Sequence, residues 1–542
     1  MQGFRITVLS TLAPRKAYAT TGVPPIRGFF ADHGKIDTLL AAIPVGVKLE
    51  VSDPFGPAGA RMRVDLRIAG LKSFRPEVLV QEVPVLRALA AVPARLTELA
   101  QRGAGREAVV EELARLLPSR AWAEAIAPDG SPGPTPAQVQ AQKASTIDSL
   151  LDQVDVSPEQ TPSAFSSLIS QVARGGSPSR SRTPAVGRER ASRALSTILG
   201  DIFDHPEFRR LERVWRSARY LLGEATAPVE VEFVPIDDQN LAEALTHLVD
   251  RPAEVVQPPD LIVLDVDVPL TDAGLAALEV PALVAERLRA PLVVSTRVDE
   301  LIENEGATQA LRKAGAAAWA PWIVIGCNGA LVRGPHATPL FKQDASSAGA
   351  HCFVSGPYLL AALAARAYKH DGWASNVSGP EAGHLGGFEV HGVMVGAETS
   401  AFASEKLVSA EAARKNARRG LFTVTAVPNR DTVVSVGVPT LASAASANAP
   451  TFSDQMFVAR IAGVVSGLGA SIPPGTDPAA AQEVAAILLA DLFPRHGGSL
   501  PTFSATVRDD TLSVTVAPRR FAGTSLGEIT LEAPLGGEAE SE

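Results

Sequence analysis

Short stretches in which apolar and polar residues alternate dominate the first 70 residues. Because successive side chains of a strand point to opposite faces, this alternation predicts strands. A turn-forming segment at 53–57 indicates that the second and third strands form a hairpin, and helical patterns continue from Pro84 to Leu117. Residues 1–127 are therefore predicted to be a small α/β domain. The alternating apolar positions are Phe4, Ile6 and Val8, then Val47, Leu49 and Val51, then Met62, Val64, Leu66 and Ile68.

Residues 128–195 are predicted to be linkers around one helix. Segments 127–136 and 175–192 are rich in Pro, Gly and Ser, a composition typical of extended connections. Between them, at about 145–172, an amphipathic pattern predicts a helix with Ile147, Leu150, Leu151 and Val154 on one face. Such a helix either docks a partner or packs on its own domain.

The pattern changes again over residues 196–542. Strands at 229–234, 261–264, 292–294 and 322–325 alternate with helical segments, which favours a largely parallel sheet covered by helices. Asp204 is the expected N-cap of a helix with Glu207 three residues later, and Gly372 is the expected left-handed end of another. The last third is richer in strands and ends in an acidic tail at 537–542. The fold class is thus mixed α/β (α+β), a small domain followed by a large sheet-and-helix body with a β-rich carboxyl-terminal region.

Composition narrows the range of functions. A net charge of −9 makes the chain a poor candidate for nucleic-acid binding. Two cysteines among 542 residues exclude a disulfide scaffold, and no signal peptide or membrane-length apolar run is present. We expect a cytoplasmic protein without membrane insertion.

One segment carries a possible catalytic motif. The apolar run that begins at Leu261 ends in Asp265-Val-Asp267, which resembles the nucleophile motif of haloacid-dehalogenase-like phosphatases. There the first carboxylate attacks phosphorus, the second serves as general acid/base, and a Lys and an acidic pair holding Mg²⁺ complete the site. Lys313 is available, but Asp509-Asp510 falls in a predicted hairpin turn. We favour two carboxylates at a strand end, and we expect no catalytic residue, no metal site and no cofactor.

The segment after the predicted hairpin closely resembles the small sheath protein of type VI secretion systems, the TssB (VipA) family. That family has a Phe-x-Pro element, then Val-Pro-x-Leu and a Leu-rich helix. The matching residues here are Phe74, Pro76, Val83, Pro84, Leu86 and Leu89.

The large body is similar to the large sheath protein, TssC (VipB). Its signature runs from His205-Pro-Glu-Phe208 through Leu211-Glu212 and Trp215 to Tyr220-Leu221. The Arg-x-Pro-Tyr-Gly element of the family is reduced here to Arg333-Gly-Pro335. The order, small then large, resembles a natural fusion of the two sheath subunits.

This resemblance implies a structural subunit of a contractile helical sheath that surrounds an inner tube and propels it. The implied partners are further copies of the chain, the tube protein, baseplate and distal cap proteins, and a AAA+ unfoldase that would engage Ile147, Leu150, Leu151 and Val154. Strand exchange would link the subunits. The residues expected on exchanged strands are Phe4, Ile6 and Val8, then Leu512, Val514 and Val516, then Ile529 and Leu531.

Overall fold

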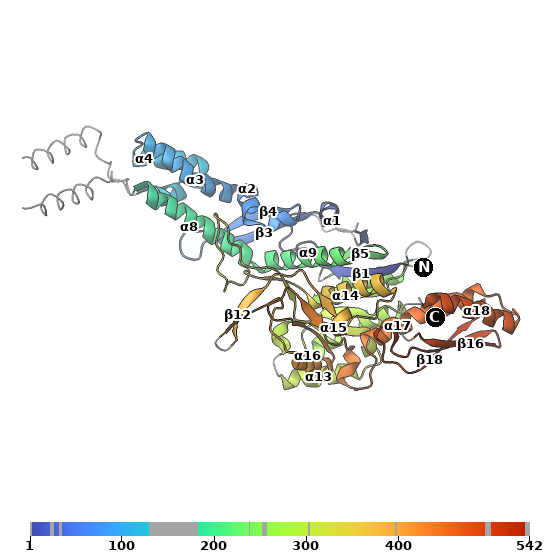
Figure 1. Ribbon diagram of the computed structural model, residues 1–542. Coiled ribbons are helices and arrows are strands. Elements are labelled where there is room, and N and C mark those ends of the chain that lie inside the picture. Colours follow the sequence, from blue (N-terminus) through green and yellow to red (C-terminus); the bar gives the residue numbers. More distant parts are fainter. Residues whose placement is uncertain are drawn as a thin grey trace, which may run out of the picture.

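A computed structural model of the chain describes residues 3–21, 26–31, 35–128, 183–237, 239–251, 257–301, 304–395, 398–493 and 500–536. The molecule is elongated, with a helical arm at one end and a small helix-and-sheet subdomain at the other (Figure 1). Between them lies a body built on one large sheet. The mixed α/β fold predicted from the sequence is confirmed.

The central sheet has nine strands in the order β11-β15-β14-β8-β7-β6-β1-β5-β2. The six from β14 to β5 run parallel, and β15, β11 and β2 are antiparallel to their neighbours. The alternation of strands and helices therefore predicted the right kind of sheet. The bounds are β1 Phe4–Ser10, β2 Phe29–Phe30, β5 Val229–Pro235, β6 Leu261–Asp267, β7 Leu292–Ser295, β8 Ile323–Cys327, β11 His384–Leu385, β14 Leu421–Ala426 and β15 Val433–Ser435.

Strand β1 lies in the interior of this sheet, between β5 and β6. Ile6 is level with Val231 on one side and with Leu261 on the other, and all seven residues of β1 are buried. The first strand of the predicted small domain is therefore an integral strand of the large body. Pairing across more than 220 residues ties the two parts into one sheet.

Helices cover both faces of the sheet and enclose two apolar cores. Ile6 and Val8 face the core beneath α9 and α14, whereas Leu9 faces the core beneath the helices between β5 and β8. The first pair has the bounds α9 Pro206–Glu224 and α14 Gly356–Asp371. The second group is α10 Leu241–Val249, α11 Asp272–Ala276, α12 Glu279–Arg287 and α13 Glu305–Gly315.

The helical arm contains the rest of the predicted small domain. Strands β3 (Val45–Ser52) and β4 (Arg61–Ile68) pair as the predicted hairpin. Helix α8 (Thr183–Asp204) packs along α3 (Figure 1), so residues 183–195, predicted as linker, belong to a long helix. The remaining elements of the arm are α1 Ile36–Ala42, η1 Leu71–Phe74, α2 Pro76–Glu82, α3 Pro84–Gln101, α4 Arg106–Leu116 and α5 Arg120–Ile126.

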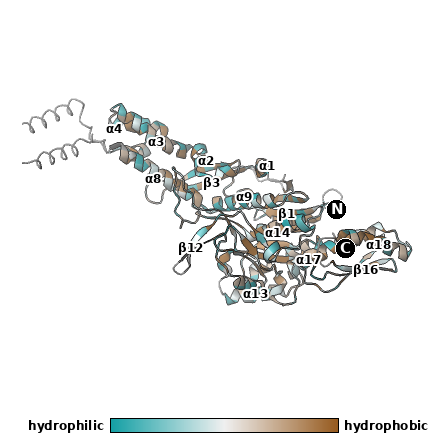
Figure 2. Cartoon of the chain, in the orientation of Figure 1, coloured by the Kyte–Doolittle hydropathy of each residue, from teal (hydrophilic) through white to brown (hydrophobic). Residues whose placement is uncertain are grey.

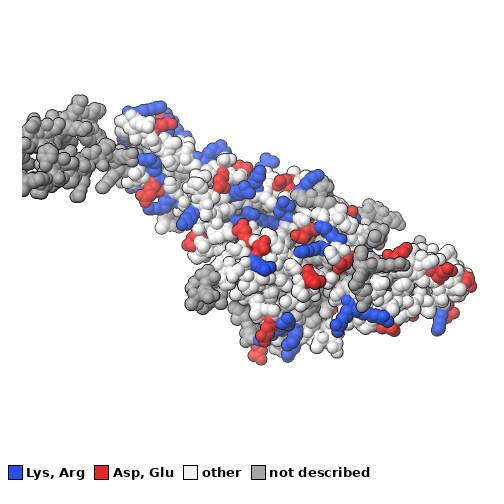
Figure 3. Space-filling view, in the orientation of Figure 1, with Lys and Arg blue, Asp and Glu red and all other residues white. Residues whose placement is uncertain are grey.

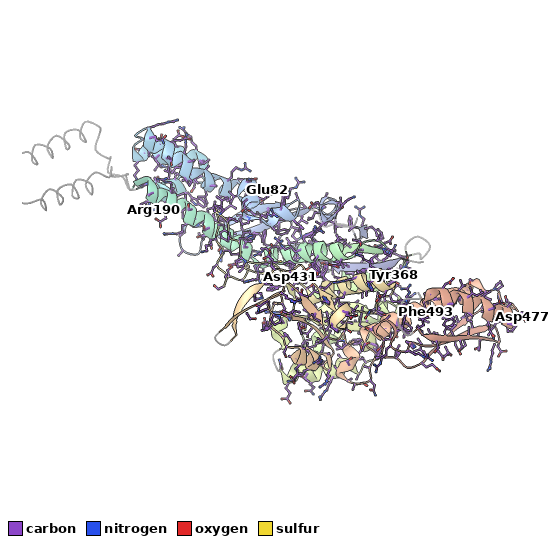
Figure 4. All side chains as sticks on the ribbon, viewed as in Figure 1. Glu82, Arg190, Tyr368, Asp431, Asp477 and Phe493 are labelled. Carbon is purple, nitrogen blue, oxygen red and sulfur yellow. The ribbon has the colours of Figure 1, made fainter. Side chains whose placement is uncertain are left out.

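The carboxyl-terminal subdomain packs two helices, α17 (Phe452–Ser471) and α18 (Pro478–Leu492), on a separate three-stranded sheet. Its strands are β16 Thr502–Arg508, β17 Thr511–Ala517 and β18 Ile529–Pro534. In Figure 4, Phe493 and Asp477 lie at opposite ends of α18, and Tyr368 lies at the end of α14 that faces this subdomain.

Shorter elements complete the body. They are η2 Val298–Leu301, η3 Ala320–Trp322, β9 Ala330–Arg333, β10 Cys352–Val354, α15 Gly379–Ala382, β12 His391–Val395, β13 Glu398–Phe402, α16 Ala410–Ala417, η4 Leu441–Ala444 and η5 Phe521–Gly523. Among the described segments, none of the helices combines the length and the apolar character needed to cross a bilayer.

Two predicted helix ends can be compared directly. Gly372 ends α14 with a φ of 70°, as predicted. The prediction for α9 was wrong, because His205 is its N-cap and accepts a hydrogen bond from the Glu207 N–H at 3.2 Å. Asp204 instead accepts a hydrogen bond from the Gly349 N–H at 2.7 Å. Asp204, the residue before the N-cap, thus holds the distant loop at Gly349 instead of capping α9.

Candidate functional site

A cavity of about 650 Å³ opens at the carboxyl edge of the central sheet, where β6, β7 and β8 end. Ligands of α/β sheets bind at this edge. Polar side chains from α9, from the strand ends and from the start of α14 converge on it. They include Arg213, Asp267, Ser295, Asn328, Ser355 and Glu405.

Asp267, the second carboxylate of the sequence motif, lines this cavity as an ion-paired group. It accepts hydrogen bonds from the Ser295 hydroxyl and from two Arg213 nitrogens at 3.2 and 3.3 Å. Burial raises the pKa of Asp267, but the Arg213 charge and the Ser295 hydrogen bond outweigh it and leave that pKa below its usual range. Asp267 is therefore a fixed negative charge rather than a proton donor.

Asp265, the first carboxylate, is only 5% exposed. One of its oxygens accepts a hydrogen bond from Ser10 at 2.7 Å and lies 3.4 Å from the Tyr358 hydroxyl. Burial raises the pKa of Asp265, and the nearby Arg213 compensates only in part. A buried carboxyl group held between α14 and β1 is poorly placed to attack a substrate from solvent.

The other parts of the phosphatase hypothesis lie elsewhere. Lys313 pairs with Asp272 on the surface at 2.9 Å. Asp509 and Asp510 form the turn between β16 and β17. Over the described ranges, no three His, Cys, Asp or Glu side chains come together as metal ligands. The structure does not bring these motif residues into one site.

Two residues of the predicted large-sheath motifs do meet. Glu212 of α9 and Arg333 of β9 form a two-point ion pair, with nitrogen–oxygen distances of 3.0 and 2.7 Å. Arg216 donates a third hydrogen bond to Glu212 at 2.8 Å, and the Glu212 side chain is 1% exposed. Burial raises the pKa of Glu212, but the two arginines outweigh it and lower that pKa. This pair fastens α9 to the β9–β10 region.

The residues expected on exchanged strands fall into two groups. Phe4, Ile6 and Val8 on β1, and Leu512, Val514 and Val516 on β17, occupy strands that are paired on both edges within the chain. An exchange through β1 would require it to leave the central sheet, and the β17 residues are 0% exposed. Ile529 and Leu531 lie on β18, which is an edge strand.

The other edge strand, β16, was not among the predicted exchange strands. Asp509 and Asp510 have φ values of 49° and 57°, as in the two-residue turn that makes the flanking Arg508 and Thr511 a hydrogen-bonded pair. Since hydrogen-bonded and non-hydrogen-bonded pairs alternate, the N–H groups of Phe503, Ala505 and Val507 point away from β17.

The same alternation on β18 directs Thr530, Glu532 and Pro534 outward. A proline has no N–H to offer, and proline and charged residues are common devices that protect sheet edges. The outward-pointing positions of β16, Phe503, Ala505 and Val507, carry neither a proline nor a charged residue. Within the described part of the chain, β16 is thus the unprotected edge of this sheet.

Helix α18, which packs on the same sheet, leaves apolar side chains uncovered. Its inward face is formed by Ala481, Ala485 and Leu489, whereas its outward face exposes Val484 at 44%, Ile487 at 57% and Leu488 at 45%. Figure 2 colours much of this helix as hydrophobic. Clustered exposed apolar residues mark interaction surfaces.

The proposed unfoldase-binding residues Ile147, Leu150, Leu151 and Val154 lie outside the described residues. Charged side chains of both signs are mixed over the face of the molecule in Figure 3, without a broad basic surface on that face.

Comparison with known proteins identifies the amino-terminal part. Residues 3–129 match a family described as "Type VI secretion system, VipA, VC_A0107 or Hcp2". No curated protein sequence matches the chain. Among solved structures, one similar chain belongs to the "Cryo-EM structure of the anti-feeding prophage (AFP) baseplate, 6-fold symmetrised". Their identity is 13%, the match covers 60% of this chain and 77% of that chain, and the TM-score is 0.33. The resemblance of the first part is therefore confirmed: residues 3–129 match the VipA family of type VI secretion systems.

Proposed function

We propose that the chain is a structural subunit of a contractile helical sheath, which assembles around an inner tube and contracts to propel it. The observation that carries this proposal is the VipA match over residues 3–129. It is supported by the position of β1, because the matched segment contributes an interior strand to a sheet formed mainly by residues after 228. A small and a large part that share one sheet act as a single unit. If the two are fused, each subunit contains one copy of each part.

A sheath subunit needs lasting contacts with its neighbours. We expect β16 to receive an extended strand from a neighbouring copy, because its outward N–H and C=O groups are unpaired and unprotected. The exposed face of α18 adjoins this sheet and would be covered by the same neighbour. Further partners on this proposal are the tube protein, baseplate and distal cap proteins and a AAA+ unfoldase at about 145–172, all in the cytoplasm.

Such a subunit stores energy in packing and does not require catalysis. Contraction needs two arrangements of the same subunits whose free energies differ by about a few kcal/mol. The ion-paired Asp267 and the buried Asp265 fit a structural part better than a reactive one.

The proposal is tested by negative-stain electron microscopy of the purified full chain after expression in bacterial cytoplasm. We expect hollow tubes with cogwheel-shaped end views. A chain that stays monomeric both alone and with a co-expressed tube protein contradicts the proposal.

The role of β16 is tested separately with proline variants. Ala505→Pro removes an outward N–H of β16 without touching the bonds to β17, and should abolish tubes while the folded monomer persists by circular dichroism. Glu532→Pro makes the matching change on the protected edge β18 and should leave tubes intact. Equal behaviour of the two variants would show that β16 is not the edge that neighbours use.

A further inference from the structure

Unpaired hydrogen-bond donors gather at the start of α14, at the inner end of the cavity described above. Ser355 is the N-cap residue of this 16-residue helix, yet its side chain makes no capping hydrogen bond. It is 8% exposed, it lines the cavity, and its hydroxyl has no hydrogen-bond partner in the protein. A buried hydroxyl left without a partner costs free energy, so its position calls for an explanation.

The backbone places the amino terminus of α14 directly on the end of β8. A Cβ added at Gly356 would lie 2.9 Å from both the Cys327 nitrogen and the Gly326 carbonyl carbon, so only glycine permits this approach. The first N–H groups of a helix have no partner within it, and the helix dipole makes this end electropositive. The helix therefore directs a partial positive charge to the carboxyl edge of the sheet.

Arg213 adds a second free donor. Two of its nitrogens bind Asp267, but its Nε atom is buried and has no partner. Four of the five carboxylates that line the cavity are engaged in ion pairs: Asp267 with Arg213, Asp299 with Lys406, Glu207 with Arg210 and Glu212 with Arg333. The fifth, Glu405, accepts one hydrogen bond from the Gly329 N–H at 3.4 Å. Asp265, which has one unpaired oxygen, is not among the lining residues. The free groups that line the cavity are thus mainly donors.

We propose that this cavity binds a small oxyanion, phosphate or a phosphomonoester, at the amino terminus of α14. The Ser355 hydroxyl, the Arg213 Nε–H and the Gly356 N–H at the start of α14 donate to its oxygens, whereas Pro357, the next residue, has no N–H to offer. A cavity of about 650 Å³ holds a phosphate together with an attached organic group. No bond is made or broken, because the buried Asp265 cannot reach the ligand as a nucleophile.

Isothermal titration calorimetry of the full chain tests this site with two probes, inorganic phosphate and O-phosphoserine, at fixed ionic strength. We expect one saturable site per chain. Tighter binding of inorganic phosphate identifies the free ion as the ligand, and tighter binding of O-phosphoserine identifies a phosphomonoester. Absence of saturable binding by either probe overturns the proposal.

Two serine variants make the test specific. Ser355→Ala removes the unpaired hydroxyl and should weaken binding about tenfold, the usual effect of one hydrogen bond to a charged group. Ser435→Ala is the matched control, because the Ser435 hydroxyl is also buried without a partner but does not line the cavity. Equal affinities of the two variants would overturn the assignment of Ser355. All titrations are made in the Ala505→Pro background, which is expected to stay monomeric, so the result is independent of sheath assembly.

Discussion

The ion pair between Glu212 and Arg333 gives the sharpest prediction about stability. Replacing Glu212 by Gln keeps the shape of the side chain but removes the only negative charge that, among the described residues, contacts Arg333. Arg333 is 7% exposed and keeps its hydrogen bonds to the carbonyls of Gly349 and Ala350, so it would remain in place as an uncompensated charge. Arg216 would lose its carboxylate partner as well.

Breaking a buried pair in this way costs about 3–5 kcal/mol. We expect the lower end, about 3 kcal/mol, because the Gln amide oxygen still accepts one hydrogen bond. Unfolding 542 residues as one unit carries an entropy of about 1.1 kcal/mol/K, so the transition midpoint should fall by about 3 °C. Calorimetry at pH 7 measures this shift.

The matched control is Glu189→Gln, which breaks an exposed pair with Arg193 whose side chains are 74% and 68% accessible. Exposed pairs contribute less than about 1 kcal/mol. Because the pKa of Glu212 is lowered in the fold, its contribution is present above the ordinary glutamate pKa of about 4.3 and is lost as the pH falls through the lower folded value. The reasoning would be refuted if Glu212→Gln and Glu189→Gln lowered the transition midpoint equally. It would also be refuted if the midpoint difference between the wild type and Glu212→Gln did not become smaller in acid.

Three further predictions concern single residues. Gly356→Ala should lower the free energy of unfolding by about 1–3 kcal/mol, because the new methyl group meets backbone atoms of β8. Gly467→Ala on α17, where nothing lies within 4 Å of the added Cβ, should raise it by about 0.5–1 kcal/mol. Denaturant midpoints distinguish the two variants. Burial raises the pKa of Asp260 to about 6, so the contribution of Asp260 to the free energy of unfolding should fall as the pH rises from about 4 to 6. Asp260→Asn should not show this loss. If the difference in melting temperature between the wild type and Asp260→Asn stays constant with pH, the raised pKa of Asp260 is contradicted. Neither the wild type nor Asp265→Asn should hydrolyse p-nitrophenyl phosphate with Mg²⁺, and an activity that disappears in the variant would restore the phosphatase hypothesis.

The sequence predicted the parallel sheet because its strands are continuous apolar runs between helices, but it could not place β1. Alternation predicts a half-buried strand, whereas the fold also buries Arg5 and Thr7 by pairing them with Glu230 and Glu232 at 2.7 and 3.1 Å. Those partners lie 225 residues away in the sequence. Local periodicity contains no information about such distant neighbours.

The candidate sites were harder to predict for a related reason. Glu212 and Arg333 were both noticed as motif residues, yet their contact depends on how α9 crosses β9. Likewise, the alternation of apolar and polar residues is stronger in β17 than in β16 and favoured β17 as the exchanged strand. In the sheet, however, β17 lies between two strands and has no free edge. Ser355 carries no sequence signal beyond a Ser before a Gly-Pro pair, since its lack of a partner is a property of the packed structure.

The interior position of β1 also restricts how a contractile subunit of this kind could change shape. Separating the VipA-like segment from the body would break both ladders of β1 and expose its seven buried residues, so the two are expected to move together. The contact between the body and the carboxyl-terminal subdomain is different in kind. There Arg460 of α17 lies over the rings of Tyr368 and Trp373, at 5.2 and 4.5 Å, beside a cavity of about 350 Å³. Side-chain contacts of this type can slide and re-form without breaking a sheet, so under the proposed function the movement of contraction is expected at this junction, with β16 carried along as the link to the next subunit.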